Sequence, residues 1–107
     1  MANDDFNNHI IHNTPNYSRM QSCLQYAQKA QSKLGRHGWA RLAQYAHNAT
    51  ELLPEAPYLV WGPEALRINA QVKKEFGNFK DVAGDFMRFV RDAKMAGYDA
   101  RMALVTV

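Results

Sequence analysis

The sequence predicts a mostly α-helical fold. We expect an N-terminal antiparallel helical hairpin packed on two further helices, with one or two short extended segments at 58–61 and 101–107. Apolar residues recur every three or four positions over most of the chain, which is the period of a helix with one buried face. Glycine or proline marks the ends of these periodic stretches. The link between the first two stretches, Gly35-Arg36-His37-Gly38, is so short that the helices it joins must fold back on each other.

The first helix of this hairpin is expected to end at Gly35, a typical C-terminal stop. Thr14 offers an N-cap for it, followed by Pro15 at the first helical position. Its buried face is predicted from residues at helical spacing: Met20, Cys23, Leu24, Ala27, Ala30, Gln31 and Leu34.

The second helix of the hairpin is expected to end at Pro54. Its apolar stripe comprises Trp39, Leu42, Ala43, Ala46, Ala49, Thr50 and Leu53. Because the two helices run antiparallel, we expect the face of Met20 and Leu24 to pack against the face of Trp39 and Leu42.

The middle of the chain leaves one assignment open. Tyr58-Leu59-Val60-Trp61 is a short apolar run typical of a buried extended segment, and Gly62-Pro63-Glu64 is a helix-start signal. Residues 65–76 fit a helix through Ala65, Ile68, Val72 and Phe76, and alternate as a strand would through Leu66, Ile68, Ala70 and Val72. The proline start and the Lys, Glu and Gln content favour the helix.

The last helix is predicted between Asn78, which can cap it, and Gly97, which ends it. Its apolar stripe is the most regular in the chain: Phe79, Val82, Ala83, Phe86, Phe89, Val90 and Ala93. Asp81 and Asp85 lie near its start, where a carboxylate interacts favourably with the helix dipole. This role explains the two carboxylates better than a catalytic pair does.

Two terminal segments are expected outside this helical body. Residues 1–16 are predicted to form an arm, either loose or docked through Phe6, Ile10 and Ile11, while 17–107 form a single domain. As a strand, residues 101–107 would project apolar side chains from both faces. Both faces would therefore have to pack against other parts of the protein or a partner strand. Either segment could join two copies of the chain into a homo-oligomer.

Composition excludes several classes of protein. The chain has 107 residues, 47% of them hydrophobic, which suits one globular domain and not a disordered chain. No apolar run approaches the roughly 20 residues that span a bilayer. The N-terminus is acidic where a signal peptide would be basic and then apolar. A single cysteine excludes an internal disulfide framework. We therefore expect a cytoplasmic protein without a membrane partner.

Charge is unevenly distributed along the chain. The 13 basic and 10 acidic residues leave a net charge of +3, but no Asp or Glu occurs between Phe6 and Thr50. The cations there are predicted to form a partner-binding face consisting of Lys29, Lys33, Arg36, His37 and Arg41, since the first three share the outer side of a helix and the last two lie at the bend. A merely solvated helical surface is the alternative interpretation.

Catalytic and metal-binding patterns are weak. Cys23 lies on an apolar stripe, which predicts a neutral, buried thiol and not a nucleophile. His9 and His12 form an H-x-x-H pair, but a metal site needs a third or fourth ligand. Phosphate-binding and dinucleotide-binding glycine patterns and a G-x-S-x-G motif do not occur. We expect no enzyme, no cofactor and no metal.

One local pattern resembles a known family. Gly77-Asn78-Phe79-Lys80-Asp81-Val82-Ala83, followed by Ala96-Gly97-Tyr98-Asp99-Ala100-Arg101-Met102-Ala103-Leu104-Val105, resembles the nucleophile helix and following strand of transglutaminase-like cysteine peptidases. Phe79 stands where that family has its catalytic cysteine. The resemblance implies at most a degenerate fragment without the catalytic residue.

Two main hypotheses for function follow. The first is a non-enzymatic interaction protein, of the inhibitor, adaptor or phage- and plasmid-type accessory kind, that binds an acidic protein through the basic hairpin. The second is a sequence-tolerant nucleic-acid-binding protein that uses the same cations. Salt separates them, because phosphate binding weakens steeply with salt for any nucleic acid whereas a protein partner is selective.

Overall fold

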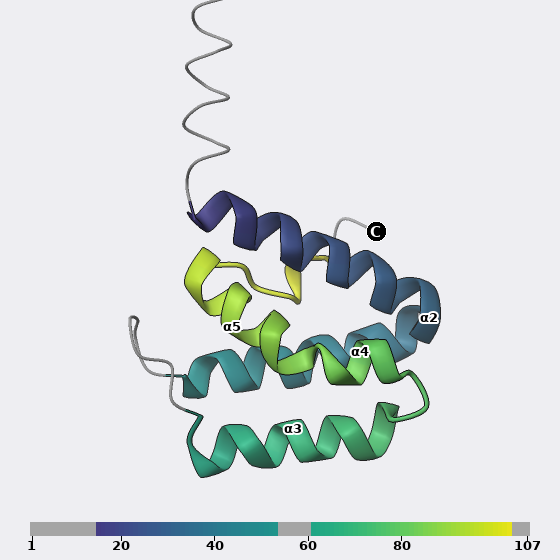
Figure 1. Ribbon diagram of the computed structural model, residues 1–107. Helices are drawn as coiled ribbons and strands as arrows, with labels where there is room; N and C mark the ends of the chain where they lie inside the picture. Colours follow the sequence, from purple (N-terminus) through teal and green to yellow (C-terminus); the bar gives the residue numbers. More distant parts are fainter. Residues whose placement is uncertain (1–14, 54–60, 104–107) are drawn as a thin grey trace, which may run out of the picture.

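The computed structural model describes residues 15–53 and 61–103, which form four helices and, within these two ranges, no strand (Figure 1). The helices are α2 (Pro15–Leu52), α3 (Pro63–Phe76), α4 (Lys80–Gly84) and α5 (Phe86–Ala96). The predicted mostly helical class is confirmed. Residues 65–76, left open between helix and strand, are helical and belong to α3.

The hairpin is one long helix with a bend. α2 is helical on both sides of Gly35, whose φ of 76° and ψ of 179° are not helical. Figure 1 shows the chain reversing its direction there. Gly38 is also required, because a Cβ at this position would lie 2.7 Å from the Cβ of Leu34. We call residues 35–38 the elbow of α2.

The core forms where α5 packs against both halves of α2. The ring of Phe89 stacks on the ring of Tyr26 from the first half, with 4.4 Å between the ring centres. The centre of the Phe89 ring lies 6.2 Å from that of Trp39 in the second half. The largest fully buried side chains are Trp39, Phe86, Leu42, Val72, Val82, Val90 and Cys23. Burying these apolar groups removes them from water, which is the main driving force for folding.

The predicted packing of Met20 and Leu24 against the second helix is not found. Leu24 is 41% exposed, and the buried positions of the first half are Cys23, Tyr26, Ala27 and Ala30. In this orientation Tyr26 is buried, and its hydroxyl donates a 2.7 Å hydrogen bond to the carbonyl of Val82. A buried tyrosine removes a large apolar ring from water while its hydroxyl keeps a hydrogen-bond partner.

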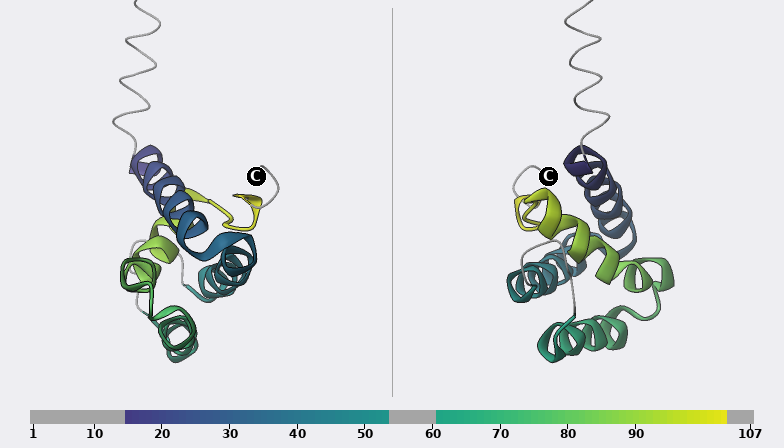
Figure 2. Two further views of the ribbon diagram at one scale, coloured as in Figure 1. Left: turned by 90° about the vertical axis from the view of Figure 1, so that its right-hand side faces the viewer. Right: turned by 60° about the vertical axis from the view of Figure 1, so that its left-hand side comes forward.

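α3 packs against the second half of α2 through Ala65, Val72 and Phe76, with the Phe76 ring 6.5 Å from Tyr45. Both views in Figure 2 show α3 at the opposite end of the molecule from the first half of α2. Among the helices of the described ranges, none is both long enough and apolar enough to cross a membrane.

Two further expectations need correction. The last predicted helix is divided into α4 and α5 by Asp85, whose φ of −93° and ψ of 4° interrupt it just after Gly84. Glycine is a poor helix former, which explains why the break falls there. At 101–107, the first three residues are not extended, because the backbone N–H of Met102 donates to the carbonyl of Asp99 at 2.9 Å and forms a turn.

Several predictions lie outside the described residues. The arm predicted over 1–16 falls within them only from Pro15, where α2 already begins. Its proposed docking residues Phe6, Ile10 and Ile11 lie outside, as do 58–60 and 104–107 of the predicted extended segments. These assignments stay predictions.

Candidate functional site

Three of the five predicted partner-binding cations are paired with carboxylates of the C-terminal half. Lys29 Nζ lies 3.0 Å from Asp85 Oδ2, and Lys33 Nζ lies 2.5 Å from Asp81 Oδ2. Arg41 donates two hydrogen bonds to the carboxylate of Glu75, at 3.0 and 2.5 Å (Nε to Oε2 and Nη2 to Oε1). The stretch from Phe6 to Thr50, which has no Asp or Glu, therefore does not present an uncompensated positive face at these positions.

The other two predicted residues lie at the elbow. Arg36 and His37 are both exposed, and within the described part of the chain neither forms an ion pair. The structure thus separates the predicted set into an unpaired centre at the bend and a paired group on the flanking helix surfaces. A partner carboxylate meets no internal competitor at the centre.

The pKa values of two of these carboxylates are lowered, as expected for a carboxylate paired with a cation. The hydrogen bond from Arg41 lowers the pKa of Glu75, and the hydrogen bond from Lys33 lowers that of Asp81. Both groups are exposed, so water and salt weaken these pairs and their contribution to stability is small. Asp81 and Asp85, assigned above to the helix dipole, also pair with Lys33 and Lys29 of α2.

The Arg41–Glu75 pair predicts a specific pH dependence. Because the pKa of Glu75 is lower in the folded than in the unfolded chain, the pair stabilises the fold above the ordinary value of 4.5 and this contribution is lost as the pH falls through the folded value. At neutral pH, Arg41→Gln is expected to unfold at a lower urea concentration than the native chain. In acid, this difference in urea midpoint should disappear. Arg67, which forms no ion pair within 15–53 and 61–103, is the control, since Arg67→Gln should show no such pH dependence. A midpoint difference for Arg41→Gln that persists unchanged in acid contradicts the assignment.

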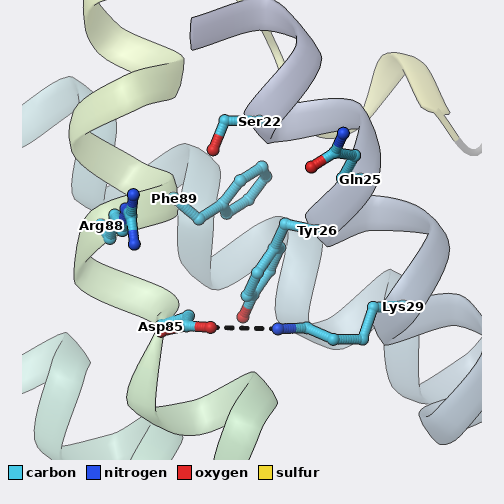
Figure 3. Close-up of a pocket in the computed structure, with 7 residues that line it drawn as sticks. All are labelled: Ser22, Gln25, Tyr26, Lys29, Asp85, Arg88 and Phe89. Carbon is cyan, nitrogen blue, oxygen red and sulfur yellow. Dashed lines mark hydrogen bonds and ion pairs between the residues drawn. The ribbon is translucent and has the colours of Figure 1, made fainter.

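A hollow of about 320 Å³ lies beside the Lys29–Asp85 pair, between the first half of α2 and α5. We call it the α2–α5 groove; its lining residues are Ser22, Gln25, Tyr26, Lys29, Asp85, Arg88 and Phe89. Figure 3 shows the Tyr26 and Phe89 rings next to each other between the two helices, with Lys29 extended toward Asp85. Sequence reasoning placed Tyr26 on neither face and missed this groove.

The groove contains no group poised for acid–base chemistry. Burial raises the pKa of Tyr26 well above its ordinary value, so its hydroxyl stays protonated and donates to Val82. Lys29 is shared between the Asp85 carboxylate and the carbonyl of Asp81, at 3.0 and 3.2 Å. Arg88 forms no ion pair in the described ranges and is free to bind a carboxylate. The chemistry that this groove supports is recognition of polar and acidic groups.

The prediction of a neutral, buried thiol is confirmed. Cys23 is fully buried, and burial together with the charge of Asp92 raises the pKa of its thiol to about 12. Since the thiolate is the reactive species, alkylation of the native chain at neutral pH should be at least ~10²-fold slower than that of the urea-unfolded chain. Fast labelling of the native chain, measured by mass spectrometry with iodoacetamide, would contradict the assignment.

His47 is the one histidine that lies between two carboxylates in the described ranges. Its Nδ1 lies 3.4 Å from Asp99 Oδ1 and its Nε2 lies 3.7 Å from Glu51 Oε1. The two carboxylates face opposite nitrogens of the ring, so they cannot share one metal ion with it. No group of three or more metal-binding side chains occurs within 15–53 and 61–103. His9 and His12 lie outside these ranges.

Comparison of the chain with known protein families, with characterised proteins and with solved structures found no significant match. The strand that the transglutaminase-like resemblance implies after the last helix is not found over residues 101–103, which form a turn with helical conformation.

Proposed function

We propose that this chain is a non-enzymatic interaction protein that binds an acidic surface of a partner protein through the elbow of α2. Arg36 and His37 form the centre of the contact. Lys29, Lys33 and Arg41 surround it. The apolar arm residues Phe6, Ile10 and Ile11 remain a predicted second contact.

The observation that supports this proposal is the surplus of positive charge in the folded part. Residues 15–53 and 61–103 contain all 13 Lys and Arg residues but only seven of the 10 carboxylates. Five of those carboxylates pair with a Lys or Arg: Glu75, Asp81, Asp85, Asp92 and Asp99. Eight cations remain without an ion pair in these ranges: Arg19, Arg36, Arg67, Lys73, Lys74, Lys80, Arg88 and Lys94. A body with this surplus attracts acidic partners.

The paired cations can take part in such a contact as well. The side chains of Lys33 and Arg41 are 44% and 62% exposed although each is paired. Exposed ion pairs contribute little net stability because water competes for both groups. A partner carboxylate can therefore replace the internal one at little cost to the fold.

Support for a non-enzymatic role comes from the state of the reactive groups. Cys23 is buried as a neutral thiol, and the hydroxyl of Tyr26 is occupied by a backbone carbonyl. Most of the described carboxylates are bound to cations. Cys23 and Tyr26 lack the exposure that a nucleophile requires, and the pKa values of Glu75, Asp81 and Asp99 are lowered, which is opposite to the shift that suits a general base.

Sequence-tolerant nucleic-acid binding is the second candidate, and α3 is the element that favours it. Arg67, Lys73 and Lys74 are exposed on α3, and none forms an ion pair within the described residues. Such a row can contact phosphates without reading bases.

A capture experiment with charge-reversed variants separates the two candidates. The native chain, Arg36→Glu with His37→Glu, and Lys73→Glu with Lys74→Glu are each immobilised and exposed to an extract of the source cell with and without nuclease. We expect one selective, acidic protein partner that is lost with the elbow variant, kept with the α3 variant and insensitive to nuclease. Binding that nuclease abolishes, or that only the α3 variant loses, favours nucleic acid. Equal retention by both variants contradicts the proposal.

A further inference from the structure

A second hollow lies on the other flank of α5, and Arg88 lines both. This hollow has a volume of about 430 Å³ and is lined by Trp61, Met87, Arg88 and Arg91. Arg88 also lines the α2–α5 groove, so this one residue borders both hollows. We call Trp61, Met87, Arg88 and Arg91 the Arg88 face.

The tertiary pairing of carboxylates leaves the two arginines of this face available. Asp85 lies one helical turn before Arg88 and is the natural intrahelical partner, but Lys29 binds it at 3.0 Å instead. Arg88 is consequently exposed and without an ion pair in the described ranges. Among the described residues, the one ion-pair partner of Arg91 is Asp92, and their distance of 3.6 Å is too long for a hydrogen bond. Both guanidiniums can therefore bind an external carboxylate.

The apolar part of the face has the composition of a protein-binding centre. Trp61 and Met87 are half-buried, so part of each side chain still meets solvent. Trp, Met and Arg are enriched in the centres of protein interfaces, and Trp and Arg dominate the residues whose removal weakens binding most. Two arginines beside a tryptophan combine both properties.

We propose that the Arg88 face binds an acidic segment of a partner protein, in which an apolar side chain covers Trp61 and Met87 while flanking carboxylates pair with Arg88 and Arg91. The inference rests on the proposed function for the class of partner and adds a site away from the elbow. The composition of the face favours a protein segment over a nucleic acid. Trp61 and Met87 offer an apolar contact beside only two cations, Arg88 and Arg91, whereas a nucleic-acid groove follows the phosphate backbone with a longer run of cations.

The test uses a fluorescein-labelled peptide with one central phenylalanine flanked by glutamates, measured by fluorescence anisotropy against the full chain. The same peptide with glutamine in place of glutamate, and an oligothymidylate of equal length, are the competing probes. Arg88→Glu with Arg91→Glu should weaken binding of the acidic peptide at least about tenfold, as expected for residues at the centre of an interface. Trp61→Ala should weaken it similarly. Lys73→Glu with Lys74→Glu, at the far end of α3 from Trp61, makes the same charge change and should leave it unchanged.

Each other outcome overturns the inference. Equal losses in the two double variants indicate unspecific attraction, tighter binding of oligothymidylate indicates nucleic acid, and no binding of the acidic peptide excludes the site. Circular dichroism of each variant checks that it is folded. If Trp61→Ala does not fold, Arg88→Glu with Arg91→Glu still decides the test. Failure here leaves the elbow proposal intact when Arg36→Glu with His37→Glu still abolishes capture of the partner.

Discussion

Replacing Trp39 with alanine is expected to lower the free energy of unfolding by about 3–5 kcal/mol, the range found when large buried aromatic side chains are removed. Trp39 is fully buried and its ring lies 6.2 Å from Phe89, so it fills the space where the second half of α2 meets α5. Few neighbouring side chains can move into the cavity, because this is where both halves of α2 and α5 converge. A domain of this size is stable by about 5–15 kcal/mol, so the loss is a large share of the total.

Urea unfolding followed by circular dichroism measures this effect. Trp39→Phe should cost much less, since it keeps a ring in place and removes the Nε1 hydrogen, which has no hydrogen-bond partner in the described structure. Met102→Ala is the control, because Met102 is 63% exposed and should change stability by no more than about 0.5 kcal/mol. A loss below about 1 kcal/mol for Trp39→Ala would show that this tryptophan is not a centre of the core.

Substituting Gly35 by alanine is expected to destabilise the fold by about 1–3 kcal/mol, because its φ of 76° and ψ of 179° lie in a region that only glycine adopts without strain. A Cβ added at this position meets no atom within 4 Å, so the cost arises from the backbone and not from a clash. The backbone conformation at Gly35 therefore depends on the absence of a side chain there, whereas Gly38 is required for space.

Two other glycines provide matched controls for the elbow substitution. Gly97 has a φ of 70° and a ψ of 25°, the left-handed conformation that asparagine tolerates, so Gly97→Asn should be milder than Gly35→Asn. Gly84 has no positive φ and open space around it, so Gly84→Ala should be neutral or raise stability by up to about 1 kcal/mol. If Gly35→Ala has the same urea midpoint as Gly84→Ala, and Gly35→Asn the same as Gly97→Asn, the backbone of Gly35 is not strained by a side chain.

The candidate site was predictable only in part. The position of Lys29, Lys33 and Arg41 on outer helix faces follows from their spacing relative to the apolar stripes. Their partners could not be found in this way, because Asp85, Asp81 and Glu75 lie 56, 48 and 34 residues away. Helical periodicity indicates which side chains face outward but says nothing about what the neighbouring element places opposite them.

The same reason explains why the two hollows were missed. The α2–α5 groove combines residues of two helices that are far apart in the sequence. The Arg88 face combines residues of α5 with Trp61, which precedes α3, and Arg88 belongs to both hollows. No spacing rule within a single helix relates Tyr26 to Phe89, or Trp61 to Arg88.

By itself, the sequence determined the helical class, the bend at Gly35, the approximate helix ends and the burial of Cys23, because these depend on local backbone preference and on the period of apolar residues. Only the tertiary structure decided which cations are neutralised, which remain available and where the surface is hollowed. Those properties depend on the rotation and approach of whole helices. Tyr26 illustrates this, because its side chain is buried and bonded to Val82 of α4 while Leu24 of the same helix faces solvent.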